Sequence, residues 1–260
     1  MSVAFRDPIS TDTRDSYIDR ALSASEESDD DAIRRVVMKC FKSPRFLYPS
    51  LDSDRSDSRR AASRLALVLH DSLPADQWLM EVASAQRLND RRQIVAAAWR
   101  MVDDYRTQAK IRRLLYHWFD MDQLGELAKD SDLYPEFNEQ MVGDLKHSFD
   151  AFLDEVVQSE TSDFRQLLQA DWALTTERIA GFYGDAWRPA QSSEILSRTA
   201  GDPAVHVGAL THPLLMAHFA HHDVTSPIHR GVFLSRYILG RVIRPPQQAF
   251  NPLDEKLHPD

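Results

Sequence analysis

Residues 137–156, FNEQMVGDLKHSFDAFLDEV, contain the longest run of apolar residues at helical spacing in this chain of 260 residues. The apolar positions recur at steps of three and four, which places them on one face of an α-helix. These positions are Phe137, Met141, Leu145, Phe149, Phe152 and Val156. The stretch therefore predicts the central helix of a helical bundle, with its aromatic and methionine side chains in the core.

Segments with the same periodicity lie on both sides of this stretch. Ser28, followed by Asp29–Asp31, is typical of the start of a helix, and Pro44 is expected to end that helix. Its apolar positions are Ile33, Val36, Val37, Cys40 and Phe41. A hydroxyl residue close before Pro213, and another directly before Pro227, indicates the start of two late helices. Further helices are predicted around residues 65–69, 78–82 (after Ser72 and Pro74), 94–101 (capped by Asn89), 111–119, 163–169 and 175–183 (closed by Gly184).

These patterns predict an all-α protein with a bundle over residues 29–184 and a smaller C-terminal helical unit over 185–260. Residues 1–28 are polar and acidic without an apolar period, so they are expected to form a mobile lead-in. One short β-hairpin is expected, with strands at 194–198 and 204–208 around the turn signal Gly201-Asp202-Pro203. The tail from residue 244 is rich in proline and is expected to be extended.

Composition and motifs exclude several classes of function. We expect no nucleic-acid partner, because the net charge of −9 would repel the negative phosphate backbone. The glycines do not form the spacings that cradle a dinucleotide or a nucleotide triphosphate. The single cysteine, Cys40, excludes an internal disulfide and covalently attached haem, and its apolar neighbours predict a buried, inert thiol. We expect no membrane span and no secretory signal in the sequence, because its apolar runs are too short.

Six of the ten histidines fall between His206 and His229, and this cluster is the first candidate site. On a continuous helix, His218 and either His221 or His222 would leave one face close together, as ligands of a divalent metal do. Further ligands could come from His212, Asp223 and His229. The alternative is that the histidines are partly buried residues bonded to loop backbone, and no spacing in the cluster is specific for a metal.

The segment Thr225-Ser226-Pro227-Ile228-His229-Arg230-Gly231 is the second candidate site. Ser226 and Pro227 predict a helix start whose free N–H groups could bind an anion beside Arg230. The alternative, which we prefer, is structural: Ser226 caps the helix, and Arg230 reaches a carboxylate of the bundle such as Asp171 or Glu177.

Several of these motifs, taken in order, resemble those of the planctomycete-type cytochrome-associated proteins, in their domain-of-unknown-function families 1592 and 1588. Residues 62–65 (ASRL), 71–76 (DSLPAD), 168–172 (LQADW) and 182–184 (FYG) are similar to the first family. Residues 208–213 (GALTHP), the segment Thr225–Gly231, and Leu239-Gly240 before Pro245-Pro246 are similar to the second. The Thr-Ser-Pro-x-x-Arg-Gly element is the most specific part of this resemblance.

The resemblance implies an extracytoplasmic setting, periplasmic or secreted, next to the domains of a cytochrome c-containing protein; without it, a cytoplasmic location is expected. It implies no particular reaction. Two hypotheses follow: a non-catalytic interaction or scaffold module of a haem-linked assembly, which we favour, and a metal-dependent hydrolytic or redox enzyme that uses the His206–His229 cluster.

Overall fold

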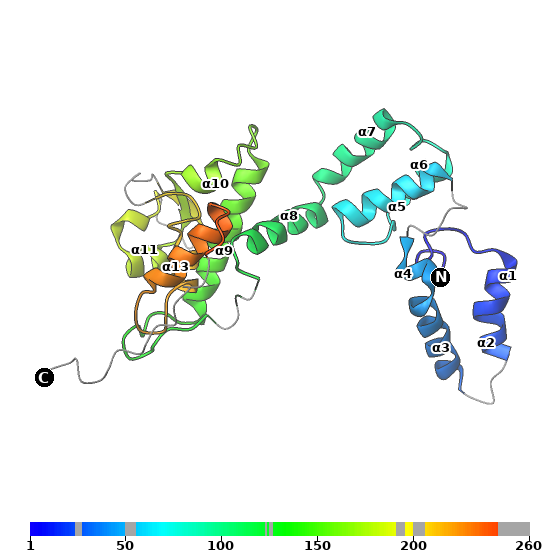
Figure 1. The fold of residues 1–260 in the computed structure, drawn as a ribbon, viewed down its shortest axis with the longest axis horizontal. Coiled ribbons are helices and arrows are strands. Elements are labelled where there is room, and N and C mark those ends of the chain that lie inside the picture. The colour runs from blue at the N-terminus through cyan, green and yellow to red at the C-terminus, as the bar shows by residue number, and fades with distance from the viewer. Residues whose placement is uncertain are drawn as a thin grey trace, which may run out of the picture. The chain divides into compact units, whose positions relative to one another are not determined.

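The computed structural model describes residues 1–23, 28–49, 56–122, 124, 127–190, 196–199 and 206–243. It divides into two compact units, Met1–Ile111 (unit 1) and Arg112–Asp260 (unit 2), and the division falls inside helix α8 (Tyr105–Trp118). The described chain is mostly helical with one small sheet, which confirms the predicted all-α class with a short β element (Figure 1). Within unit 2, α12 (Pro213–His218), which belongs to the expected C-terminal unit over 185–260, packs against α9 (Glu139–Gln158) of the expected bundle over 29–184.

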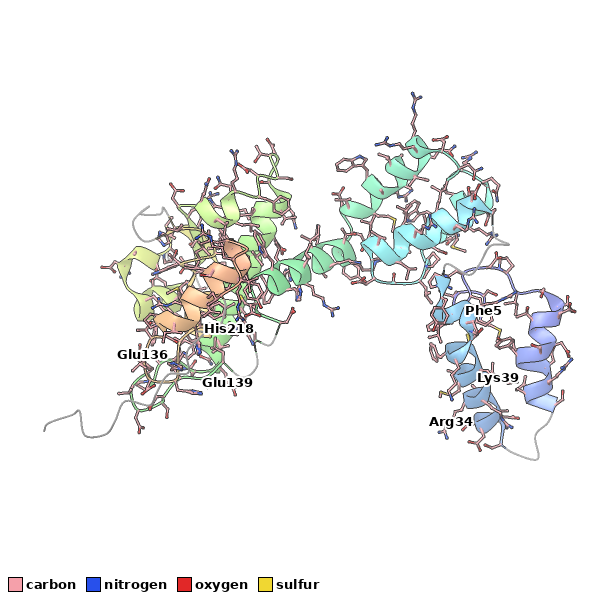
Figure 2. All side chains as sticks on the ribbon, viewed as in Figure 1. Phe5, Arg34, Lys39, Glu136, Glu139 and His218 are labelled. Atoms are coloured by element: carbon pink, nitrogen blue, oxygen red, sulfur yellow. The ribbon has the colours of Figure 1, made fainter. Side chains whose placement is uncertain are left out.

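Unit 1 begins with three short helical segments where the sequence predicts a mobile lead-in. These are α1 (Thr11–Arg14), η1 (Asp15–Asp19) and α2 (Arg20–Ser23), and they run beside α3 (Asp29–Lys42) (Figure 1). Phe5 is buried against Tyr17, with ring centroids 5.4 Å apart, and Figure 2 labels its position. The N-terminal segment has no apolar helical period of its own, so these tertiary contacts hold it in place. Residues 24–27, with the acidic pair Glu26-Glu27, lie outside the described residues.

Helix α3 confirms its predicted start, because Ser28 accepts a hydrogen bond from the backbone N–H of Asp31. Its end is set by Ser43, which caps α4 (Pro44–Leu47). Cys40 is buried, and burial raises the pKa of its thiol, as expected of an inert cysteine. The predicted apolar face is only partly covered within unit 1, since Ile33, Val37 and Phe41 are 54%, 43% and 50% exposed.

The core of unit 1 lies between α5 (Asp57–Leu69), α6 (Gln77–Ser84) and α7 (Arg91–Val102). All three helices were predicted. The start of α7 is one residue later than expected, because Asp90 rather than Asn89 accepts the N–H of Gln93. Asn89 instead accepts a hydrogen bond from the hydroxyl of Ser58, 2.6 Å away, and so ties the loop to α5.

Unit 2 is built on α9, which confirms the prediction from the 137–156 stretch. Asn138 caps this helix, and its buried side chains are Met141, Leu145, Ser148, Phe149, Phe152, Leu153 and Val156. Figure 1 shows α10 (Gln166–Gln169) and α11 (Glu177–Tyr183) beside it. Gly184 closes α11, as predicted, at a φ of 94° that favours glycine.

The small sheet has a different pairing from the expected hairpin. Strand β2 (Ser197–Thr199) overlaps the first expected strand, but its antiparallel partner is β1 (Ala173–Thr175). The expected turn at residues 201–203 and part of the second expected strand lie outside the described residues, and Val207 and Ala209 form only an isolated bridge. Strand β1 also packs on α9, so the sheet lies against the central helix.

The remaining helical segments are η3 (Asp185–Trp187), α12, α13 (Pro227–Phe233) and η4 (Leu234–Ile238). Gly240 follows with a φ of 61°. The proline-rich tail from residue 244 lies outside the described residues. Among the helices that the structure describes, none combines the length and the apolar character needed to cross a membrane.

Candidate functional site

His212 lies in the core of unit 2, where it joins three elements. Its Nδ1 accepts the backbone N–H of Leu214, 3.2 Å away, so the imidazole caps α12. Its Nε2 lies 3.0 Å from the hydroxyl of Ser148 on α9, and that hydroxyl donates to the carbonyl of Leu174 in β1. The ring also packs 4.9 Å from the ring of Phe149.

These contacts fix the protonation of His212. Since Nδ1 accepts a hydrogen bond, the ring proton is on Nε2. The Nε2–H then donates to the hydroxyl oxygen of Ser148, and the Ser148 hydroxyl donates to the carbonyl of Leu174. Burial, and to a lesser extent the nearby His206, lowers the pKa of His212 to about 3. His212 is therefore a neutral core residue and a helix cap.

His206 is also buried and lies against Trp187, with ring centroids 4.5 Å apart. Between these two histidines, the chain makes a close backbone contact at Gly208. Its N–H donates to the carbonyl of Ala170, and that of Ala209 donates to Leu167. Gly208 has a φ of 52°, and a Cβ there would lie 2.4 Å from the carbonyl oxygen of Leu167. The segment 206–213 is thus held against residues 167–170 of unit 2 by backbone hydrogen bonds.

The other histidines do not share one helix face. Helix α12 ends at His218, so His221 and His222 lie beyond it and the expected helical spacing does not apply. The chain leaves the helix here because Lys129 Nζ takes up the carbonyls at and just after its C-terminal end, those of Ala217, Ala220 and His221. His218, labelled in Figure 2, is placed by its Nε2, which lies 3.1 Å from the carbonyl oxygen of Asp120.

The structure brings together one pair from the predicted metal set. The rings of His221 and His229 are 5.1 Å apart, edge to face. The backbone of His222 accepts from Asp130, and that of Asp223 accepts from Tyr134. In the part of the chain that the structure describes, no group of three His, Cys, Asp or Glu side chains is placed to hold a metal ion. The metal site therefore stays a prediction without a ligand set.

The Thr225–Gly231 segment forms the predicted helix start. Ser226 is buried and accepts the N–H of His229, with Pro227 in the first turn of α13. The expected partner of Arg230 is wrong: its guanidinium donates to the hydroxyl of Thr225, 2.6 Å away, and among the described residues it forms no ion pair. Glu177 is instead 3.6 Å from Arg188.

The sequence patterns do not predict two features of the structure. One is a pocket of about 480 Å³ beside Arg230, lined mainly by apolar side chains. Its walls come from segments separated in sequence, and the only sequence signal was the motif that contains Arg230. The other is a charged network in unit 1, built on Arg106.

In that network, Arg106 donates to Asp76 and Asp104 at 2.8 Å each. His70, at the end of α5, has its Nδ1 3.5 Å from Asp76. Hydrogen bonds from Arg106 hold the pKa of Asp104 well below its usual range, and the two carboxylates raise the pKa of Arg106. The ring of His70 is almost completely buried, and the network joins the end of α5 to Asp76, the N-cap of α6, and to Arg106 in α8.

The fold and the candidate site define a helical protein of two units, whose histidine-rich C-terminal segment docks on a central helix. Comparison with family models identifies the segments. Residues 57–184 match PSD4, a protein of unknown function (DUF1592), and residues 206–260 match PSCyt3, a protein of unknown function (DUF1588). Together the two matched segments cover more than half of the chain, and each segment is similar to one of these two families. The resemblance drawn from the motifs is confirmed. No curated protein and no solved structure matches the chain.

Proposed function

We propose that this chain is a non-catalytic interaction or scaffold module that positions partner domains of a haem-linked extracytoplasmic assembly. The two family matches in tandem support a cytochrome-related context, since both families bear names associated with planctomycete cytochrome-related domains. The chain's partners in this proposal are the domains of a cytochrome c-containing protein. The haem belongs to those partners.

The observation that carries the proposal is the use that the fold makes of its histidines. His212 caps a helix inside the core, His206 packs on Trp187, and His218 binds a backbone carbonyl. Each of these contacts positions a segment of unit 2. A general base works best when its pKa lies near the working pH, and burial lowers the pKa of His212 to about 3.

A binding measurement tests the proposal. The probe is a purified cytochrome c-like domain from a protein that also carries these two domains, titrated into the full chain by calorimetry. We expect saturable binding and an unchanged haem spectrum. Absence of binding at the highest concentrations that can be reached would contradict the proposal.

A second measurement compares the proposal with metal-dependent catalysis. The chain is purified without a histidine tag and without chelators, and its transition metals are quantified. We expect less than one metal per chain. A stoichiometric metal, with a turnover that His218→Ala abolishes and His147→Ala does not, would refute the non-catalytic role. His147 is an exposed histidine of α9 and serves as the matched control.

A further inference from the structure

An apolar pocket lies between α12 and the start of α13 in unit 2. Its volume is about 480 Å³, within the range of small-molecule sites. Phe219 and Phe233 form one wall, with their rings stacked at a centroid distance of 4.6 Å. Leu210, Met216 and Leu234 add further apolar side chains to the lining. Leu234 is 39% exposed, so the pocket has an open side.

Arg230 is the only charged side chain among the described residues that line this pocket. A guanidinium has five N–H donors, and within the described part of the chain the one side-chain partner of Arg230 is the neutral hydroxyl of Thr225. Donors therefore remain for an anion. Thr211 adds a second polar group, because its hydroxyl oxygen accepts the N–H of Val207 and its own proton is left to donate.

A smaller pocket of about 240 Å³ shares Met216 and Arg230 with the first. Its other cation, Lys129, is occupied by three backbone carbonyls, and burial lowers the pKa of its ammonium group. Its carboxylate, Asp223, forms no ion pair with Arg230. Arg230 is therefore the cation available to a ligand.

We propose that the larger pocket binds a small apolar carboxylate, that is, a carboxylic acid with a hydrocarbon tail. The planar guanidinium of Arg230 matches a carboxylate in two parallel hydrogen bonds, and one positive charge neutralises one negative charge. The tail lies against Phe219 and Phe233, where it leaves water. This site goes beyond the proposed function, which concerns protein domains, so failure of one leaves the other standing.

Calorimetry of the full chain with octanoate tests the site, with butyrate and octanol as probes that lack the long tail and the charge. We expect saturable octanoate binding at one site per chain and weaker binding of both other probes. Arg230→Gln should weaken octanoate binding about tenfold or more, since a charge-assisted pair is lost. Arg236→Gln, a change at an exposed arginine of the following turns, is the matched control and should not alter binding.

A second variant fills the pocket without touching the charge. Gly231 lines the pocket, and a Cβ added there meets nothing within 4 Å, so Gly231→Leu should fold and occupy the space of the tail. Gly143→Leu, at an exposed helical glycine of α9 with the same open surroundings, is its control. We expect octanoate binding to be lost in Gly231→Leu and kept in Gly143→Leu.

The site is refuted if octanoate does not bind, or if Gly231→Leu keeps wild-type affinity. Equal losses in Arg230→Gln and Arg236→Gln would also overturn it, because they would indicate attraction to the surface rather than a bidentate pair. Circular dichroism of each variant separates a lost site from a lost fold.

Discussion

Acidification should destabilise unit 2 through His212. Its Nδ1 accepts the N–H of Leu214, so a proton added there removes the cap of α12 and places a charge in the core. Burial, then His206, lowers the pKa of His212 from 6.5 to about 3. The unfolded chain therefore binds a proton in a pH range where the folded chain does not.

The sign and size of the effect follow from that difference. The contribution of His212 is complete above pH 6.5 and is lost as the pH falls from 6.5 toward 3. Each pH unit in this window costs about 1.4 kcal/mol of unfolding free energy. At pH 5 the loss is about 2 kcal/mol, a large part of the stability of an ordinary domain.

Urea unfolding at pH 7 and pH 5, followed by circular dichroism, measures this loss in the wild type and in His212→Asn. Asparagine is a good helix cap and does not titrate, so the variant should lose about 2 kcal/mol less than the wild type between the two pH values. An NMR titration of the wild-type imidazole gives a second result that needs no variant. Equal losses in both proteins, or a His212 that titrates near pH 6.5, would refute the reasoning.

Three further changes test other contacts. Gly208→Ala should destabilise unit 2 by about 3 kcal/mol or more, from a positive φ and a Cβ against the Leu167 carbonyl, and a melting temperature equal to wild type would contradict this. Arg106→Met should cost about 1–3 kcal/mol in urea unfolding, because two carboxylates of unit 1 lose their donor; no loss would show that water replaces it. Arg230→Ala should cost about 1 kcal/mol or less, a melting shift of no more than about 4 °C, since a single hydrogen bond to Thr225 is lost; a larger drop would reveal a buried role.

The residues of the candidate site can be picked out from the sequence, but their arrangement cannot. The sequence shows the histidines as a cluster, and their spacing on a continuous helix predicts one shared face, but α12 ends at His218. That end depends on Lys129, almost ninety residues earlier in the chain. Likewise, the pocket beside Arg230 exists only when Leu210 and Phe233 are folded together.

The sequence alone determined most of the helical segments after residue 28 and where several of them start. Ser28 and Ser226 cap their helices as predicted, and Gly184 closes α11. The 137–156 pattern placed the central helix of unit 2 and its buried face. These features are local, because a cap or an apolar stripe involves residues within a few turns of one another.

Only the tertiary structure decided which segments meet. Strand β2 pairs with β1 rather than with the residues that follow it, and Phe5 anchors an N-terminal segment without a helical pattern of its own. His212 caps a helix through Nδ1, its unprotonated nitrogen, and a metal would bind that same nitrogen. Such pairings join residues far apart in the chain, and their free energy depends on competing surfaces and burial, which no local pattern of residues contains.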